Sequence, residues 1–101
     1  MIAMSRFKKA PAGPVELTLY SKPECPLCDT LERELAGLLT PGEAVVTKVS
    51  IETDVALSEA WGWRIPVVAA GDEVLAEGRL NAAAFRARFD VLRERRALEE
   101  S

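Results

Sequence analysis

The sequence predicts an α/β domain with the element order βαβαββα, in which three helices flank a four-stranded mixed sheet. Three observations support this prediction. Four short runs of alternating or β-branched apolar residues indicate strands, and apolar residues spaced by three and four indicate helices between them. The dipeptide Gly71-Asp72 separates the last two runs and is typical of a two-residue hairpin turn. With 101 residues, 49% of them hydrophobic, the chain has the size of one small domain.

The strands are expected in four stretches, at residues 15–20, 44–51, 67–70 and 73–76. In the first stretch, Val15, Leu17 and Leu19 alternate with more polar side chains, which is the pattern of a strand with one buried face. A helix joins the first two strands, so we expect them to be parallel, and we expect the same of the first and third. The last two strands are expected to form an antiparallel hairpin.

The helices are expected at residues 26–39, from Thr53-Asp54 to about Trp61, and from Ala82 to Leu92. The first helix follows a turn at residues 21–24. Asn81 is the predicted N-cap of the last helix, because its side chain can accept a hydrogen bond from the first turn. The chain from Arg93 onward is highly charged and is expected to fray.

The two ends of the chain differ from its middle in composition. Residues 1–14 are interpreted as a flexible leader, because two prolines and a glycine near its end break helices. The folded domain is therefore expected over residues 15–93. Residues 94–101 are expected to form a charged C-terminal tail.

Cys25 and Cys28 are the only cysteines in the chain, and two residues separate them. This spacing suits a small disulfide or two thiolate ligands for a metal. A closed structural zinc site needs four ligands, usually sulfur or imidazole, and the chain has no histidine, so we expect no metal site. Cys25 is placed as the N-cap of the first helix, with Pro26 at its first position. Cys28 heads the apolar stripe of that helix, so we expect an exposed first cysteine and a shielded second one.

Composition argues against several classes of protein. The net charge of −3, from 16 acidic and 13 basic residues, comes without a basic stripe and gives no sign of nucleic-acid binding. No apolar run approaches the 18 or more residues of a membrane helix, and the N-terminal residues lack the apolar core of a signal peptide. We therefore expect a cytoplasmic monomer with no membrane or nucleic-acid partner. In a reducing compartment, a lone C-x-x-C is more often catalytic than structural.

The element order, the C-x-x-C at the first strand-to-helix junction and a proline just before the third strand together resemble the thioredoxin fold. The stretch Leu19-Tyr20-Ser21-Lys22-Pro23-Glu24-Cys25-Pro26-Leu27-Cys28 is similar to that of glutaredoxins and small glutaredoxin-like proteins. Leu27 takes the place of the tyrosine in the glutaredoxin Cys-Pro-Tyr-Cys, and Arg64-Ile65-Pro66 matches the glutaredoxin Thr-Val-Pro.

The resemblance implies a small dithiol thiol–disulfide oxidoreductase. Cys25, at a helix N-terminus that favours an anion, would be the nucleophile that forms a mixed disulfide, and Cys28 would resolve it. The implied substrate is a disulfide-containing protein or a low-molecular-weight thiol. No bound cofactor is expected, and glutathione or a reductase is the possible electron donor. Glu77-Gly78 and Asn81 stand where glutaredoxins carry the Gly-Gly pair and the acid that hold glutathione, so this site is half matched.

Four further residues complete the predicted substrate-binding site. In the family fold, the proline at position 66 is cis and faces the disulfide. Ile65 would supply backbone groups that pair with substrate. Leu27, beside the nucleophile, suits an apolar protein substrate as well as a small thiol. Lys22 would add a positive charge near Cys25, with solvated surface as its other reading.

The residues also allow other functions. The chain is alternatively a non-catalytic thioredoxin-fold module that binds a partner or senses redox state through its cysteines. A more remote alternative is an iron–sulfur or zinc carrier formed between two chains through Cys25. Trp61 and Trp63 are expected to pack in the core or at its rim, with substrate stacking as the alternative. Arg64 is interpreted either as a surface charge or as a substrate contact.

Overall fold

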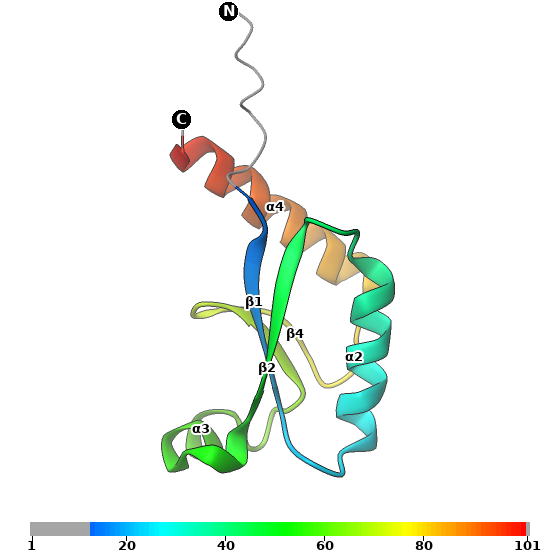
Figure 1. Ribbon diagram of the computed structural model, residues 1–101, viewed down its shortest axis with the longest axis vertical. Coiled ribbons are helices and arrows are strands. Elements are labelled where there is room, and N and C mark those ends of the chain that lie inside the picture. Colours follow the sequence, from blue (N-terminus) through cyan, green and yellow to red (C-terminus); the bar gives the residue numbers. More distant parts are fainter. Residues whose placement is uncertain (1–12, 101) are drawn as a thin grey trace, which may run out of the picture.

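The computed structural model describes residues 13–100 and confirms the predicted α/β class and element order (Figure 1). The elements are β1 (Val15–Ser21), α2 (Pro26–Leu38), β2 (Ala44–Ser50), the 3₁₀ turn η2 (Ile51–Thr53), α3 (Val55–Trp61), β3 (Val67–Ala70), β4 (Glu73–Glu77) and α4 (Ala82–Glu100). The strands form one mixed sheet in the order β2-β1-β3-β4, a thioredoxin-like arrangement. Residues 1–12 of the predicted leader and residue 101 of the predicted tail lie outside the described residues.

The strand directions differ from the prediction at one pair. β1 and β2 are parallel, in register from Val15 with Ala44 to Ser21 with Ser50. The prediction that β1 and β3 are parallel is wrong, because they pair antiparallel. Two short elements, η2 and the seven-residue α3, connect β2 to β3. Both lie at the end of the sheet where β2 finishes, so β3 enters the sheet from that same end and runs in the opposite direction (Figure 1). A parallel β3 would need a crossover that returns along the sheet.

α2 and α4 pack on one face of the sheet. The core between them consists of Val15, Leu17, Leu19, Leu31, Leu35, Val68, Leu75, Ala76, Phe85, Phe89 and Leu92. These side chains include three alternate positions of β1 and residues of the predicted apolar stripes of the two helices. Fully burying one large apolar side chain contributes about 1.5–3 kcal/mol. The core therefore holds α2, and with it the cysteine-bearing helix end, at a fixed place against β1.

α4 is longer than the sequence pattern predicted. It continues to Glu100, so the expectation that the chain frays from Arg93 is wrong. Leu92 is buried, and the next turn is tied down by ion pairs from Arg93 to Glu43 and from Arg95 to Glu73. Arg, Glu, Leu and Ala are also strong helix formers, which favours continuation of the helix. Neither α4 nor any other helix among residues 13–100 is long and apolar enough to cross a membrane.

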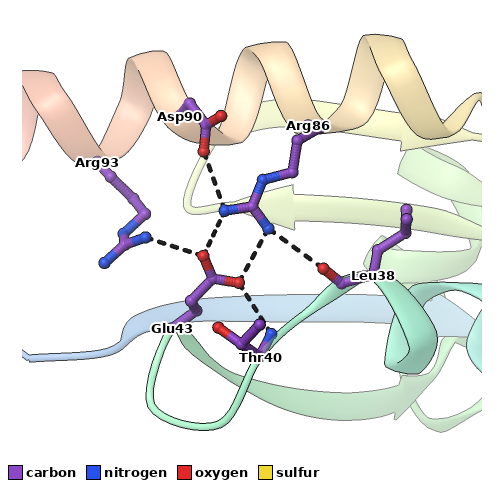
Figure 2. Close-up of polar contacts among 6 residues, drawn as sticks. All are labelled: Leu38, Thr40, Glu43, Arg86, Asp90 and Arg93. Atoms are coloured by element: carbon purple, nitrogen blue, oxygen red, sulfur yellow. Dashed lines mark hydrogen bonds and ion pairs between the residues drawn. The ribbon is translucent and has the colours of Figure 1, made fainter.

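A polar cluster joins the loop between α2 and β2 to α4 (Figure 2). Glu43 lies at its centre and accepts hydrogen bonds from Arg86, from Arg93 at 3.0 Å and from the Thr40 backbone N–H at 2.9 Å. Arg86 also reaches the Leu38 carbonyl at 3.2 Å and Asp90 at 3.1 Å. Hydrogen bonding to Arg86, and then to the Thr40 N–H, lowers the pKa of Glu43 to about 2.

Candidate functional site

The two cysteines lie together at the N-terminus of α2. Cys25 is the N-cap, with extended backbone, and Cys28 lies in the first turn. A disulfide joins their sulfurs, and their Cα atoms are 5.2 Å apart. Cys25 is partly exposed, whereas only 1% of the Cys28 surface is exposed. The structure thus agrees with the expected exposed first cysteine and shielded second one.

One backbone N–H group faces the Cys25 sulfur. The N–H of Cys28 lies 3.1 Å from the Cys25 sulfur and points at it, and the N–H of Asp29 donates to the Cys25 carbonyl at 3.0 Å. The open N–H groups and the dipole of a helix N-terminus stabilise negative charge at this point. When the disulfide is reduced, the same arrangement favours a thiolate on Cys25, which is the reactive form of cysteine.

The segment before β3 holds the predicted proline. The Ile65–Pro66 peptide bond is cis, as the resemblance implied. Pro66 is buried, and its carbonyl accepts a hydrogen bond from the N–H of Gly78 at 2.8 Å. The N–H of Ile65 donates to the Trp61 carbonyl at 3.1 Å. The Ile65 carbonyl accepts no hydrogen bond within residues 13–100.

Leu27 and Lys22 line two different grooves on either side of the first turn of α2. The groove on the β4 side measures about 130 Å³ and is lined by Leu27, Thr30, Leu31, Glu34, Gly78, Arg79 and Leu80. The groove on the β2 side measures about 420 Å³ and is lined by Ser21, Lys22, Pro23, Glu24, Asp29, Lys48 and Ser50. The structure therefore does not bring these two predicted substrate residues into one pocket. Leu27 is instead linked to Pro66 through Gly78. Gly78 lines the same groove as Leu27, and its N–H donates to the Pro66 carbonyl.

Comparison with known proteins identifies the family. A model of the glutaredoxin-like domain (DUF836) matches residues 16–91, a span that contains both cysteines and the cis-proline. The chain belongs to this glutaredoxin-like family. A solved relative of the glutaredoxin-like chain is the X-ray structure of Northeast Structural Genomics target protein XcR50 from X. campestris, with 32% sequence identity and a TM-score of 0.63. The match covers 74% of this chain and 96% of that one. A search of curated proteins found no match.

The glutaredoxin-like site contains an ion pair that the sequence analysis did not foresee. Arg64 donates to the Glu77 carboxylate at 2.8 Å and 3.3 Å, and this hydrogen bonding lowers the pKa of Glu77. The Arg64 guanidinium also lies 4.9 Å from the centre of the Trp61 ring, which in turn stacks on Tyr20 with 4.8 Å between ring centres. Arg64 is therefore a surface charge that pairs within the chain, with 41% of its side chain exposed.

A signal for this pair was present in the hairpin. β3 and β4 pair so that Val67 lies opposite Glu77. Arg64 lies three positions before Val67, the first residue of β3, so a cation just before the hairpin faces an acid at its end. The two are 13 positions apart in sequence, and only the hairpin register brings them together.

Trp63 of the glutaredoxin-like chain contradicts the expectation of packing. Trp61 is half-buried against Tyr20, as a residue at the rim of the core should be. Trp63 is instead 99% exposed. The backbone N–H groups of Arg64 and Ile65 both donate to the Trp61 carbonyl, so the chain makes a tight turn here. The Trp63 side chain projects from this turn into solvent.

No group of three or more metal-ligating side chains that could hold an ion occurs among residues 13–100 of this glutaredoxin-like chain. Its two sulfur ligands are joined to each other in the disulfide. The chemistry that this geometry offers is exchange at that bond, with one sulfur accessible and the other shielded.

Gly78 has a backbone conformation that other residues adopt with strain. Its φ is +72°, and an added Cβ would meet no atom within 4 Å, so an alanine there suffers from backbone strain alone. We expect Gly78→Ala to lower the free energy of unfolding by about 1 kcal/mol in urea denaturation. Gly37→Ala is the matched control, because Gly37 lies inside α2 with open space for a Cβ. It should raise stability by about 0.5–1 kcal/mol, and equal losses in the two variants would contradict the argument.

Proposed function

We propose that this chain is a small dithiol thiol–disulfide oxidoreductase, in which Cys25 attacks and Cys28 resolves. The observation that carries the proposal is the Cys25–Cys28 disulfide at the N-terminus of α2, with a backbone N–H directed at the accessible sulfur and the second sulfur buried. A disulfide between two residues of one helical turn is open to exchange on the Cys25 side. Membership of the glutaredoxin-like family supports the same chemistry.

The reaction starts from the reduced dithiol. The Cys25 thiolate attacks one sulfur of the substrate disulfide, forms a mixed disulfide and releases the other substrate sulfur as a thiolate, which takes up a proton. Cys28 then loses its proton and attacks the Cys25 sulfur, which forms the Cys25–Cys28 disulfide and releases the second substrate thiol. The substrate gains two electrons and two protons, and the protein dithiol loses the same number.

Other groups near the disulfide have supporting roles in this proposal. The Ile65 carbonyl, which has no hydrogen-bond partner within residues 13–100, would accept a hydrogen bond from a substrate backbone. Leu27 and Lys22, which line the grooves on either side of the nucleophile, would contact the substrate side chains. A thiol donor, either glutathione or a reductase, returns the protein disulfide to the dithiol. We expect the protein to work as a monomer in the cytoplasm, because such donors keep thiols reduced in that compartment.

Trapping of the mixed disulfide tests the proposal. Cys28→Ser lacks the resolving thiol, so after reaction with glutathione disulfide, or with a peptide that contains one disulfide, it is expected to retain an adduct on Cys25. Mass spectrometry of the intact protein and of its peptides measures the adduct and its position. The preferred partner identifies the class of substrate or donor.

Two control proteins make the trapping experiment decisive. The wild type should carry little adduct, because Cys28 displaces it, and Cys25→Ser should react far more slowly because its remaining thiol is buried. If Cys25→Ser forms an adduct as fast as Cys28→Ser, the assignment of attacker and resolver is wrong.

A further inference from the structure

Trp63 is the most exposed large apolar side chain among residues 13–100, at 99% exposure. Trp61, two positions before it, is by contrast half-buried and stacks on Tyr20. Tryptophan carries a large apolar surface and is among the residues most enriched at the energetic centres of protein interfaces. An isolated exposed apolar residue needs no explanation by itself, so its meaning depends on how it is held and where it lies.

The backbone around Trp63 is held on both sides. The N–H of Gly62 donates to the Ser58 carbonyl at 2.8 Å, and the N–H of Arg64 donates to the Trp61 carbonyl at 2.8 Å. The Arg64 side chain is fixed by Glu77 and by the Trp61 ring. The backbone that carries Trp63 is therefore already ordered. A partner that covers the ring has to immobilise only one side chain, and the loop itself does not have to become ordered. Preorganisation of this kind improves binding.

Trp63 also lies close in the chain to Ile65, to which the proposed function assigns a substrate contact. Trp63 and Ile65 are two positions apart in the chain, so their Cα atoms lie at most about 7 Å apart, and the Ile65 carbonyl is open. Ile65 precedes Pro66, whose carbonyl binds Gly78, and Gly78 shares a groove with Leu27 next to the cysteines. An extended substrate advances about 3.3 Å per residue, so a polypeptide that pairs with the Ile65 carbonyl spans the distance to the Trp63 Cα in about two residues.

We infer that Trp63 is a specificity residue that selects disulfides carried by polypeptides, by covering an apolar side chain a few residues from the reacting cysteine. This inference rests on the proposed oxidoreductase function. A small disulfide occupies only the space next to the sulfurs, within the grooves of about 130 Å³ and 420 Å³ that Leu27 and Lys22 line. A polypeptide gains a further contact outside these grooves, on the exposed ring.

Steady-state kinetics with two substrates test the inference, with dithiothreitol as the reductant. The substrates are a peptide with one disulfide and an apolar side chain nearby, and hydroxyethyl disulfide. We expect Trp63→Ala to lower the ratio of kcat/KM for the peptide to kcat/KM for the small disulfide about tenfold, mainly through a higher KM for the peptide. Trp63→Phe should restore most of the ratio. Val55→Ala is the matched control, because Val55 is 74% exposed on α3 and is expected to leave the ratio unchanged.

A fluorescence measurement gives a second readout that does not depend on turnover. In a Trp61→Phe, Cys28→Ser variant, Trp63 is the only tryptophan. Trapping a tryptophan-free peptide on Cys25 should lower the quenching of Trp63 by acrylamide, whereas trapping hydroxyethyl thiol should not. An unchanged kinetic ratio in Trp63→Ala, or equal quenching in the two adducts, would overturn the inference while the oxidoreductase function stands. A wild type that reduces neither substrate would overturn both.

Discussion

Cys25→Ser is expected to slow the reduction of a small disulfide by about 10³-fold or more, because a serine hydroxyl at neutral pH cannot replace the thiolate as nucleophile. The remaining thiol, on Cys28, is 1% exposed and cannot approach a disulfide in solution without local opening of α2. The measurement is a single turnover: fully reduced protein is mixed with excess hydroxyethyl disulfide, and the released thiol is followed by its absorbance after separation. This arrangement needs no electron donor and therefore reports on the cysteines alone.

Stoichiometry separates the steps of the reaction. With two cysteines per chain, the wild type should release two thiol molecules per chain as its disulfide closes. Cys28→Ser should release one at a comparable initial rate and keep the other half of the substrate as an adduct. A wild type that reacts no faster than Cys25→Ser would contradict the oxidoreductase, and the alternative of a non-catalytic module whose cysteines only sense redox state would then be preferred.

Most of the fold was predictable from local pattern. The alternation of Val15, Leu17 and Leu19 and the helical stripe through Leu31 and Leu35 are buried as expected, because a single buried face imposes a period on the residues that form it. The direction of β3 was not predictable in this way. It depends on where the chain lies after α3, and that position is a property of tertiary packing rather than of any residue in β3. The length of α4 likewise depends on distant ion pairs, which helix periodicity does not report.

In the candidate site too, some features were predictable from local pattern and others depend on tertiary structure. The motif located both cysteines and their unequal exposure, because a C-x-x-C at a helix start places its first residue outside the helix and its second on the buried face. The cis-proline followed from the resemblance to the family. The exposure of Trp63 had no sequence signal, since a tryptophan between a glycine and an arginine is as consistent with packing as with exposure. Only the backbone turn that returns Arg64 and Ile65 to Trp61 decides between the two.

Glu43→Gln is expected to lower the free energy of unfolding by about 2–3 kcal/mol. The Glu43 side chain is only 11% exposed and connects the loop before β2 to α4 through Arg86 and Arg93 (Figure 2). Glutamine keeps the size of the side chain and its bond from Thr40, but leaves both guanidinium groups without the carboxylate. Breaking a fully buried pair costs about 3–5 kcal/mol, and the partial exposure of both arginines to water reduces this cost.

Urea denaturation followed by circular dichroism measures this loss. Glu73→Gln is the matched control, because Glu73 pairs with Arg95 of the same helix while both side chains are more than 40% exposed. A pair this exposed contributes about 0–1 kcal/mol. If Glu43→Gln costs no more than Glu73→Gln, the buried cluster is not what holds α4 against the loop.

The contribution of Glu43 should also depend on pH in a defined direction. Its pKa is about 2 in the folded protein, against 4.5 ordinarily, so the unfolded chain binds the proton more readily than the folded one. The stabilisation is therefore complete above pH 4.5 and is lost as the pH falls toward 2. The difference in unfolding free energy between wild type and Glu43→Gln should stay constant from neutral pH to about 5 and then shrink. Other carboxylates titrate alike in both proteins, so the difference isolates Glu43, and a difference that persists undiminished at pH 2 would show that stability does not depend on the charge of this carboxylate.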